Sequence, residues 1–111
     1  MVAVDDYPEL VEKILTQHTV VPYAHGEIRI QPIFDRERGH YLVMLVGRQG
    51  IRRVHGCLIH IEIAAGKLLV HRDGTEYGVA RELVDASVPA DRIVLAFPSA
   101  EERVDSPFAV A

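Results

Sequence analysis

Four extended runs separated by very short connections constrain the fold of this chain more than any other feature. The runs cover residues 28–33, 41–46, 52–63 and 68–71, and the connections between them contain Gly39, Gly50 and Gly66. Connections of this length join antiparallel neighbours, because a parallel crossover needs a dozen or more residues. We therefore predict a four-stranded antiparallel meander, in which the second run, apolar on both faces, is a central strand.

Helical signals lie on both sides of the meander. The sequence DYPE at residues 6–9 precedes apolar residues at helical spacing and predicts a helix over residues 7–20, opened by a capping box of Asp6 and Glu9. The sequence DGTE at residues 73–76 predicts a second helix over residues 76–86, with Asp73 and Glu76 as its cap rather than as paired catalytic acids. Gly78 weakens this helix or delays its start.

The order of these elements predicts an α+β fold. An N-terminal helix is followed by the meander, the second helix and a final strand over residues 92–97, which Pro98 ends. A chain of 111 residues without linker or repeat indicates one domain over residues 1–111. Residues 99–111 form a tail that we expect to be either loosely ordered or anchored by Phe108, on its own chain or on a partner subunit.

Charge and composition exclude several classes of protein. The net charge of −4 predicts that direct DNA binding is weak or absent, unless a local patch of cations exists. The single cysteine permits no internal disulfide. The first residues lack a secretory signal pattern, and no apolar run approaches the roughly 20 residues of a membrane span. We therefore expect a cytoplasmic protein without membrane contact.

The run over residues 52–63 contains most of the reactive side chains. Strict strand alternation predicts His55 and Cys57 on one face and His60 and Glu62 on the other. Cys57 with His55 is a conceivable thiolate pair, and His60 with Glu62 and His71 is a conceivable metal site, so a small enzyme or metal-binding module remains open. We favour a structural cysteine and hydrogen-bonded histidines, and assign no catalytic, cofactor or metal residue.

Three arginines cluster at the second connection. Arg48, Arg52 and Arg53 flank the turn at residues 49–50. They are candidates for contact with phosphate or with an acidic protein surface, although we favour a solvated turn as the explanation. No aromatic residue lies beside them as a stacking platform for bases.

The chain resembles the XisI family, the controlling factors for excision of the fdxN DNA element, found largely in cyanobacteria. The resemblance rests on ordered segments from end to end: residues 26–28, 33–35, 46–47, 52–57, 60–61, 66–67, 73–76 and 108–110. The chain departs from the family pattern at Arg48, where tryptophan is frequent, and at Pro98, where histidine is frequent.

This resemblance implies an accessory, non-enzymatic role in programmed DNA rearrangement. Its implied partners are an XisH-like protein with a nuclease-like fold and a site-specific recombinase, which performs the strand exchange. A cofactor is not implied. We further expect a homo-oligomer, most simply a dimer, because the two-sided apolar strands offer a surface for self-association.

Overall fold

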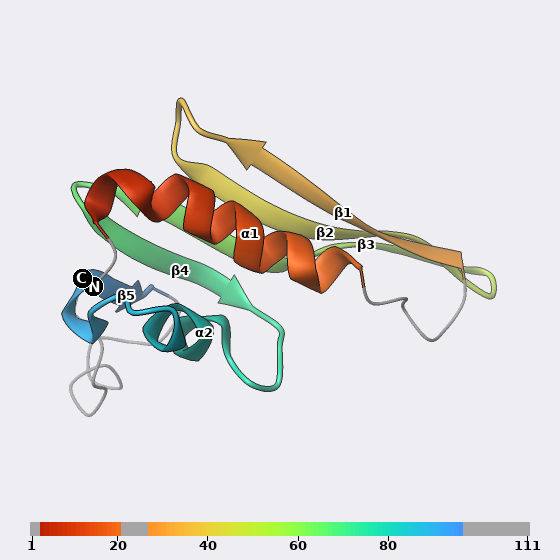
Figure 1. Ribbon diagram of the computed structural model, residues 1–111. Helices are drawn as coiled ribbons and strands as arrows, with labels where there is room; N and C mark the ends of the chain where they lie inside the picture. The colour runs from red at the N-terminus through yellow and green to blue at the C-terminus, as the bar shows by residue number, and fades with distance from the viewer. Residues whose placement is uncertain (1–2, 21–26, 97–111) are drawn as a thin grey trace.

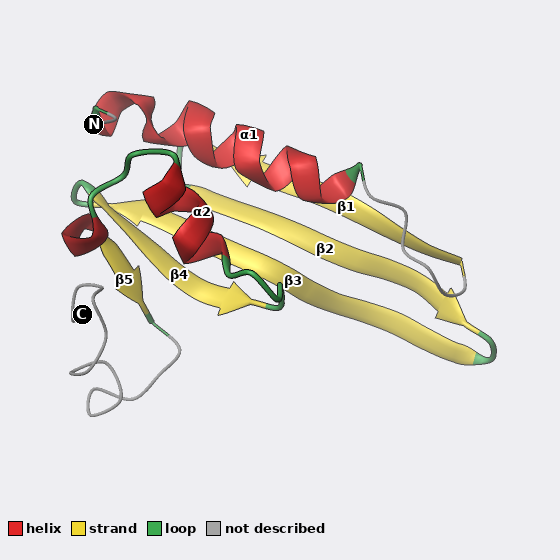
Figure 2. Ribbon diagram, turned by 60° about the horizontal axis from the view of Figure 1, so that its bottom comes forward, coloured by secondary structure: helices red, strands yellow, loops and turns green. Residues whose placement is uncertain are grey.

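A five-stranded sheet with two helices on one face forms the framework of the protein (Figures 1 and 2). The computed structural model describes residues 3–20 and 27–96. The strands are β1 (Glu27–Asp35), β2 (His40–Gln49), β3 (Arg52–Ala64), β4 (Lys67–Asp73) and β5 (Ile93–Leu95). The helices are α1 (Tyr7–Thr19) and α2 (Val79–Asp85), and short 3₁₀ turns occupy Val4–Asp6 and Ala90–Arg92.

The sheet confirms the predicted meander and adds a parallel edge. Its strand order is β1-β2-β3-β4-β5, with antiparallel pairing from β1 to β4. Strand β5 pairs in parallel with β4, because α2 returns the chain to the same end of the sheet. The final strand is shorter than the predicted residues 92–97, and Phe97, Pro98 and the tail over residues 99–111 lie outside the described residues.

Two tight turns fix the register of the long strands. Gln49 pairs with Arg52, so Gly50 and Ile51 form a two-residue loop in which Gly50 has a φ of 65°. Ala64 pairs with Lys67, and both loop residues there, Ala65 and Gly66, have positive φ, as a type I′ turn requires. Two-residue loops leave no slack for a register slip next to the turns, so each loop determines which side chains face each other up to the first shift in register.

The core lies between the helices and one face of the sheet. Its buried residues are Tyr7, Val11, Ile14, Leu15, Tyr41, Val43, Ile59, Ile61, Leu68, Val70, Val79, Ala80, Leu83, Val88 and Ile93. Apart from Val88, which lies in the loop after α2, they come from α1, α2 and the inward positions of β2 to β5, so both helices cover the same face. The opposite face, which we call the helix-free face, is not covered by either helix.

The helix starts differ from the predicted capping boxes. Helix α1 begins at Tyr7 as predicted, but the Asp6 side chain makes no capping hydrogen bond, because the preceding 3₁₀ turn gives Asp6 a helical backbone. Helix α2 covers Val79–Asp85 rather than residues 76–86, with Gly78 at the N-cap position at a φ of 99°. The delay at Gly78 is confirmed, and the Asp73–Glu76 capping box is wrong.

Candidate functional site

A β-bulge at Leu58 changes which side chains of β3 share a face. Met44 of β2 pairs with Cys57 and Val43 pairs with Ile59, so Leu58 has no partner in the register. The extra residue reverses the alternation of side chains between the two faces of the sheet, because two residues of β3 lie opposite one residue of β2. His55 and Cys57 therefore share the helix-free face with His60 and Glu62. The predicted separation of these residues onto opposite faces was wrong, because strict alternation does not allow for a bulge.

Three histidines and one carboxylate form a row across the helix-free face. His40 Nδ1 lies 3.1 Å from His60 Nε2, and the two rings are 5.3 Å apart. The His60 ring is 4.8 Å from that of His71, whose Nε2 lies 2.8 Å from Glu62 Oε1. This histidine row joins β2, β3 and β4. It confirms that His60, Glu62 and His71 lie together and adds His40, which lies outside the predicted run over residues 41–46.

The electrostatics of the row keep His60 in its neutral form. Burial lowers the pKa of His60, and the neighbouring His71 and His40 lower it further. The hydrogen bond with His71 lowers the pKa of the Glu62 carboxyl, which therefore stays ionised. In the part of the chain that the structure describes, no group of three or more such side chains is placed to hold a metal ion. The geometry is that of a hydrogen-bonded polar network.

Protonation of His60 is expected to destabilise the fold as the pH falls. Because its pKa is lowered from 6.5 in the folded protein, the unfolded chain takes up the proton more readily. Stability is therefore present above about pH 6.5 and is lost as the pH falls towards the lower folded pKa. The melting temperature, followed by circular dichroism, should fall by a few degrees between pH 7.5 and pH 5.5.

The histidine variants test this assignment. His60→Gln should flatten the pH dependence, whereas His55→Gln, at an exposed position outside the row, should leave it unchanged. Equal pH dependence in wild type and His60→Gln would contradict the assignment. A further loss of stability below about pH 4.5 in both proteins is expected from Glu62, because its carboxyl has a lowered folded pKa.

Cys57 has the environment of a structural thiol. Its Sγ donates to the Ile59 carbonyl oxygen at 3.2 Å. Burial raises the pKa of the Cys57 thiol, and the nearby Arg72 cation only partly opposes this effect. A raised pKa leaves little thiolate at neutral pH, which disfavours nucleophilic chemistry. Among the described residues, His55 makes no hydrogen bond with this sulfur, so the reactive pair considered from the sequence is not assembled.

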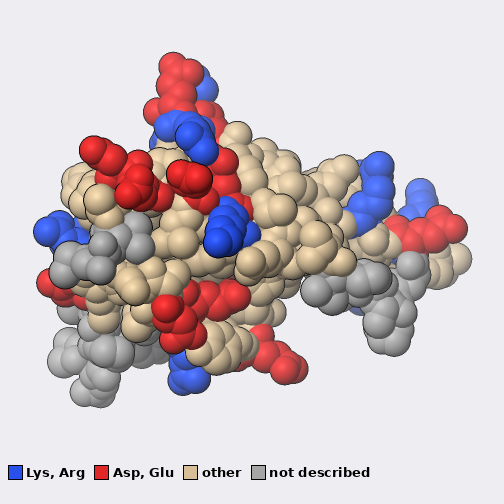
Figure 3. Space-filling view, in the orientation of Figure 1, with Lys and Arg blue, Asp and Glu red and all other residues tan. Residues whose placement is uncertain are grey.

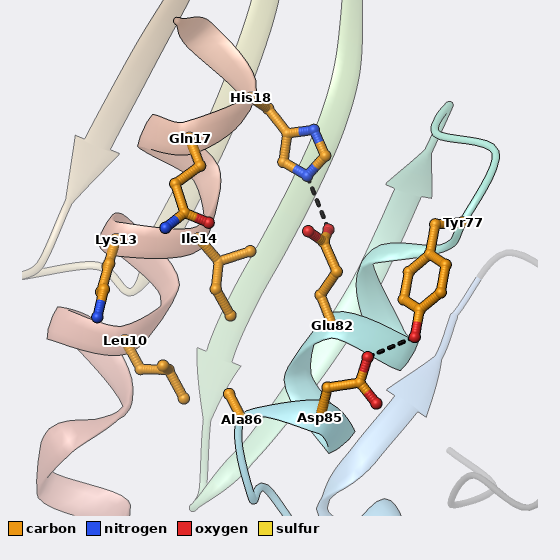
Figure 4. Close-up of a pocket in the computed structure, with 9 residues that line it drawn as sticks. All are labelled: Leu10, Lys13, Ile14, Gln17, His18, Tyr77, Glu82, Asp85 and Ala86. Carbon is orange, nitrogen blue, oxygen red and sulfur yellow. Dashed lines mark hydrogen bonds and ion pairs between the residues drawn. The ribbon is translucent and has the colours of Figure 1, made fainter.

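A groove with a volume of about 470 Å³ lies between the two helices (Figure 4). Leu10, Ile14 and Ala86 give it an apolar floor. At one end His18 Nε2 lies 2.7 Å from Glu82 Oε2, which ties α1 to α2. On the α2 side of the groove, the Tyr77 hydroxyl donates a hydrogen bond to the Asp85 carboxylate. Because these polar groups are already paired within the chain, the groove is explained as a junction between the helices.

The candidate arginines lie at the far end of the β2–β3 hairpin. Arg48 pairs directly with Arg53 in the register, and Arg52 pairs with Gln49. All three are exposed. Within the described ranges none of them forms an ion pair with an acid. The structure therefore brings together the three residues that the sequence singled out.

Comparison with known proteins assigns the family. The family model described as "XisI protein" matches residues 1–110. The chain belongs to the XisI family. The fold class expected from this family, with its N-terminal helix, meander, second helix and final strand, is confirmed, apart from the parallel pairing of β5. No curated protein sequence matches the chain.

Two solved structures resemble this XisI family member over nearly its whole length. A XisI-like protein from Anabaena variabilis ATCC 29413 is 36% identical, with a TM-score of 0.89, over 98% of this chain and 100% of the other. The fdxN element excision controlling factor XisI from the same organism is 24% identical, with a TM-score of 0.83, over 97% of this chain and 98% of the other. In the described residues, no helix has the length and apolar character needed to cross a membrane.

Proposed function

We propose that this protein is a cytoplasmic, non-enzymatic regulator of DNA-element excision that acts by binding protein partners. The observation that carries the proposal is the family match over residues 1–110. A protein of the same fold is described as the fdxN element excision controlling factor XisI. Control of excision is thus the activity to test first in this chain.

The chemistry of the described residues supports a role without catalysis. The only thiol is held in its protonated form by burial, and the histidines and Glu62 are hydrogen-bonded to one another. The strand-exchange reaction is therefore assigned in this proposal to a site-specific recombinase, and a XisH-like protein is the second partner. The XisI family member itself supplies a folded binding surface.

Co-expression with the XisH-like protein encoded in the same genome tests the partner. The complex would be captured through a tag on the XisH-like protein at moderate salt, and its mass measured by light scattering. A stoichiometric complex is expected, and light scattering of the isolated chain should give the mass of a dimer. A tagged, unrelated basic protein of similar size serves as the control for non-specific charge attraction. Failure of the folded chain to join the complex would contradict the partner assignment.

A plasmid excision assay tests the activity itself. The plasmid carries a fdxN-type element between its recombination sites, and the recombinase is expressed with or without this protein. We expect the excision frequency to change at least about tenfold when the protein and the XisH-like partner are both present. An excision frequency independent of this protein, in cells that contain it in folded form, would contradict a regulatory role.

A further inference from the structure

Beyond the helices the sheet consists of β1, β2 and β3, and only residues 49–52 of the β2–β3 hairpin extend past the first pair of β1, Glu27 with Arg48. Figures 1 and 2 show β2 and β3 continuing together past the end of α1 and far past β4. We call residues 48–53 the hairpin arm. All six of its residues are exposed, and Ile51 at the tip is 100% exposed. The arm therefore has a shape that reaches outward from the body of the protein.

Cations gather on and beside this arm. Arg48 and Arg53 are directly opposite each other on adjacent strands, an arrangement of like charges that destabilises a sheet. Arg29 of β1 and His55 of β3 both pair with Val46, which is two residues from Arg48. Arg29 and His55 therefore lie on the same face of the sheet as Arg48. Glu27 lies opposite Arg48 but forms no ion pair with it among the described residues. An anionic ligand would relieve the repulsion between the opposed arginines.

The charge of the protein is thus unevenly distributed. The net charge is −4, yet the arm contains three arginines and no acid. Figure 3 shows Asp and Glu side chains gathered over the helical layer, whereas at the end of the sheet that bears the arm Lys or Arg side chains lie with acidic side-chain atoms beside them. This distribution orients the arm towards a polyanion while the helical layer is repelled from it.

We propose that the hairpin arm binds duplex DNA, with Arg48, Arg52 and Arg53 on phosphates and Ile51 inserted in the groove. Beyond Arg48 only β2 and β3 remain, and a two-stranded ribbon of this kind fits the major groove, which is about 12 Å wide. In the major groove an apolar side chain such as that of Ile51 can contact the methyl group of thymine. Gly50 provides the sharp turn that leaves Ile51 at the apex. This inference adds a direct DNA contact to the proposed function. It rests on that function only for its biological setting.

DNA binding is measured by fluorescence anisotropy with an end-labelled, mixed-sequence duplex of about 30 base pairs. The expected Kd is on the order of 10 μM at 50 mM salt, weakening steeply as salt is raised. The test variant is Arg48→Gln/Arg53→Gln. Its affinity should fall roughly tenfold at 50 mM salt, and the slope of log K against log salt should flatten by roughly 2.

The matched control replaces two exposed arginines that lie outside the hairpin arm. Arg38 lies in the turn between β1 and β2, and Arg81 lies on α2. Arg38→Gln/Arg81→Gln changes the net charge by the same amount, so its affinity should stay within about twofold of wild type. Equal losses in the two double variants, with unchanged melting temperatures, would overturn the arm as the binding site. Absence of salt-dependent binding by wild type at 100 μM protein would overturn it as well.

A variant of Ile51 distinguishes insertion of this side chain from phosphate contact by the arginines. Ile51→Ser should weaken binding several-fold while leaving the salt slope unchanged, because the three arginines remain. Unchanged affinity in this variant would overturn the insertion. If wild type binds a fluorescent polyglutamate peptide through the arginines but not the duplex, the arm recognises an acidic protein and the DNA proposal is wrong.

The two proposals fail independently. Capture by the XisH-like protein tests the partner without DNA, and anisotropy tests the arm without any partner. Loss of capture with intact DNA binding would remove the partner and leave the arm. The reverse result would leave a regulator that meets DNA only through its partners.

Discussion

Replacing Gly47 by alanine is expected to lower the free energy of unfolding by about 3 kcal/mol. Gly47 lies opposite Ile28 in the sheet and has a φ of 154°. A Cβ atom at this position would come within 1.9 Å of the Glu27 carbonyl oxygen and 2.8 Å of Ile28 Cα. Both are backbone atoms, which cannot turn aside as a flexible side chain does. The start of β1 must therefore move away from β2.

Urea denaturation followed by circular dichroism measures this loss. Gly56→Ala is the matched control, because Gly56 lies on the same hairpin, its φ is not positive, and a Cβ atom there meets no atom within 4 Å. Its effect should stay within about 0.5 kcal/mol. A Gly47→Ala variant as stable as Gly56→Ala would show that β1 does not pass this closely over β2.

The meander was predictable because its information is local. Two-residue loops allow only antiparallel neighbours, and Gly50 and Gly66 mark those loops in the sequence. The parallel pairing of β5 was not predicted, because the choice of edge depends on how α2 packs on the sheet. That packing is set by buried residues such as Val79 and Leu83, whose partners are distant in sequence.

The faces of β3 were mispredicted for a physical reason. Alternation is a property of a regular strand, and a single extra residue at Leu58 reverses it for everything beyond. Leu58 gives little sign of this in the sequence. In the structure its carbonyl oxygen accepts a hydrogen bond from the Gly74 backbone N–H, so the bulge is tied to the loop after β4. A contact between residues this far apart was not visible in the sequence.

The histidine row was half predictable. His60, Glu62 and His71 were named together from their alternation on neighbouring strands, and they do lie together. His40 was missed because it lies just outside the predicted run over residues 41–46. Regular pairing from the Gly50 turn would place it opposite Ile61, and only the bulge at Leu58 brings it opposite Glu62.

The loop before α2 yields the second large effect. Replacing Asp73 by alanine is expected to cost about 3 kcal/mol, because one carboxylate serves two segments of the chain. Its Oδ1 accepts from the backbone N–H of Thr75 at 3.0 Å and also from the Thr75 hydroxyl. Its Oδ2 accepts from the backbone N–H of Val79 at 2.7 Å, which caps the start of α2. Without the carboxylate, partly buried donors are left unpaired.

Two companion variants separate this loop from the predicted capping box. Asp73→Asn keeps one acceptor oxygen and should lose about half as much stability. Glu76→Ala removes the residue that a capping box would require, but Glu76 is exposed and makes no side-chain hydrogen bond within the described ranges, so its cost should stay within about 0.5 kcal/mol. Urea denaturation gives these values, and hydrogen exchange of the Val79 amide reports the cap directly. Equal losses for Glu76→Ala and Asp73→Ala would restore the capping box and contradict the loop geometry, since only a reciprocal cap depends on both carboxylates.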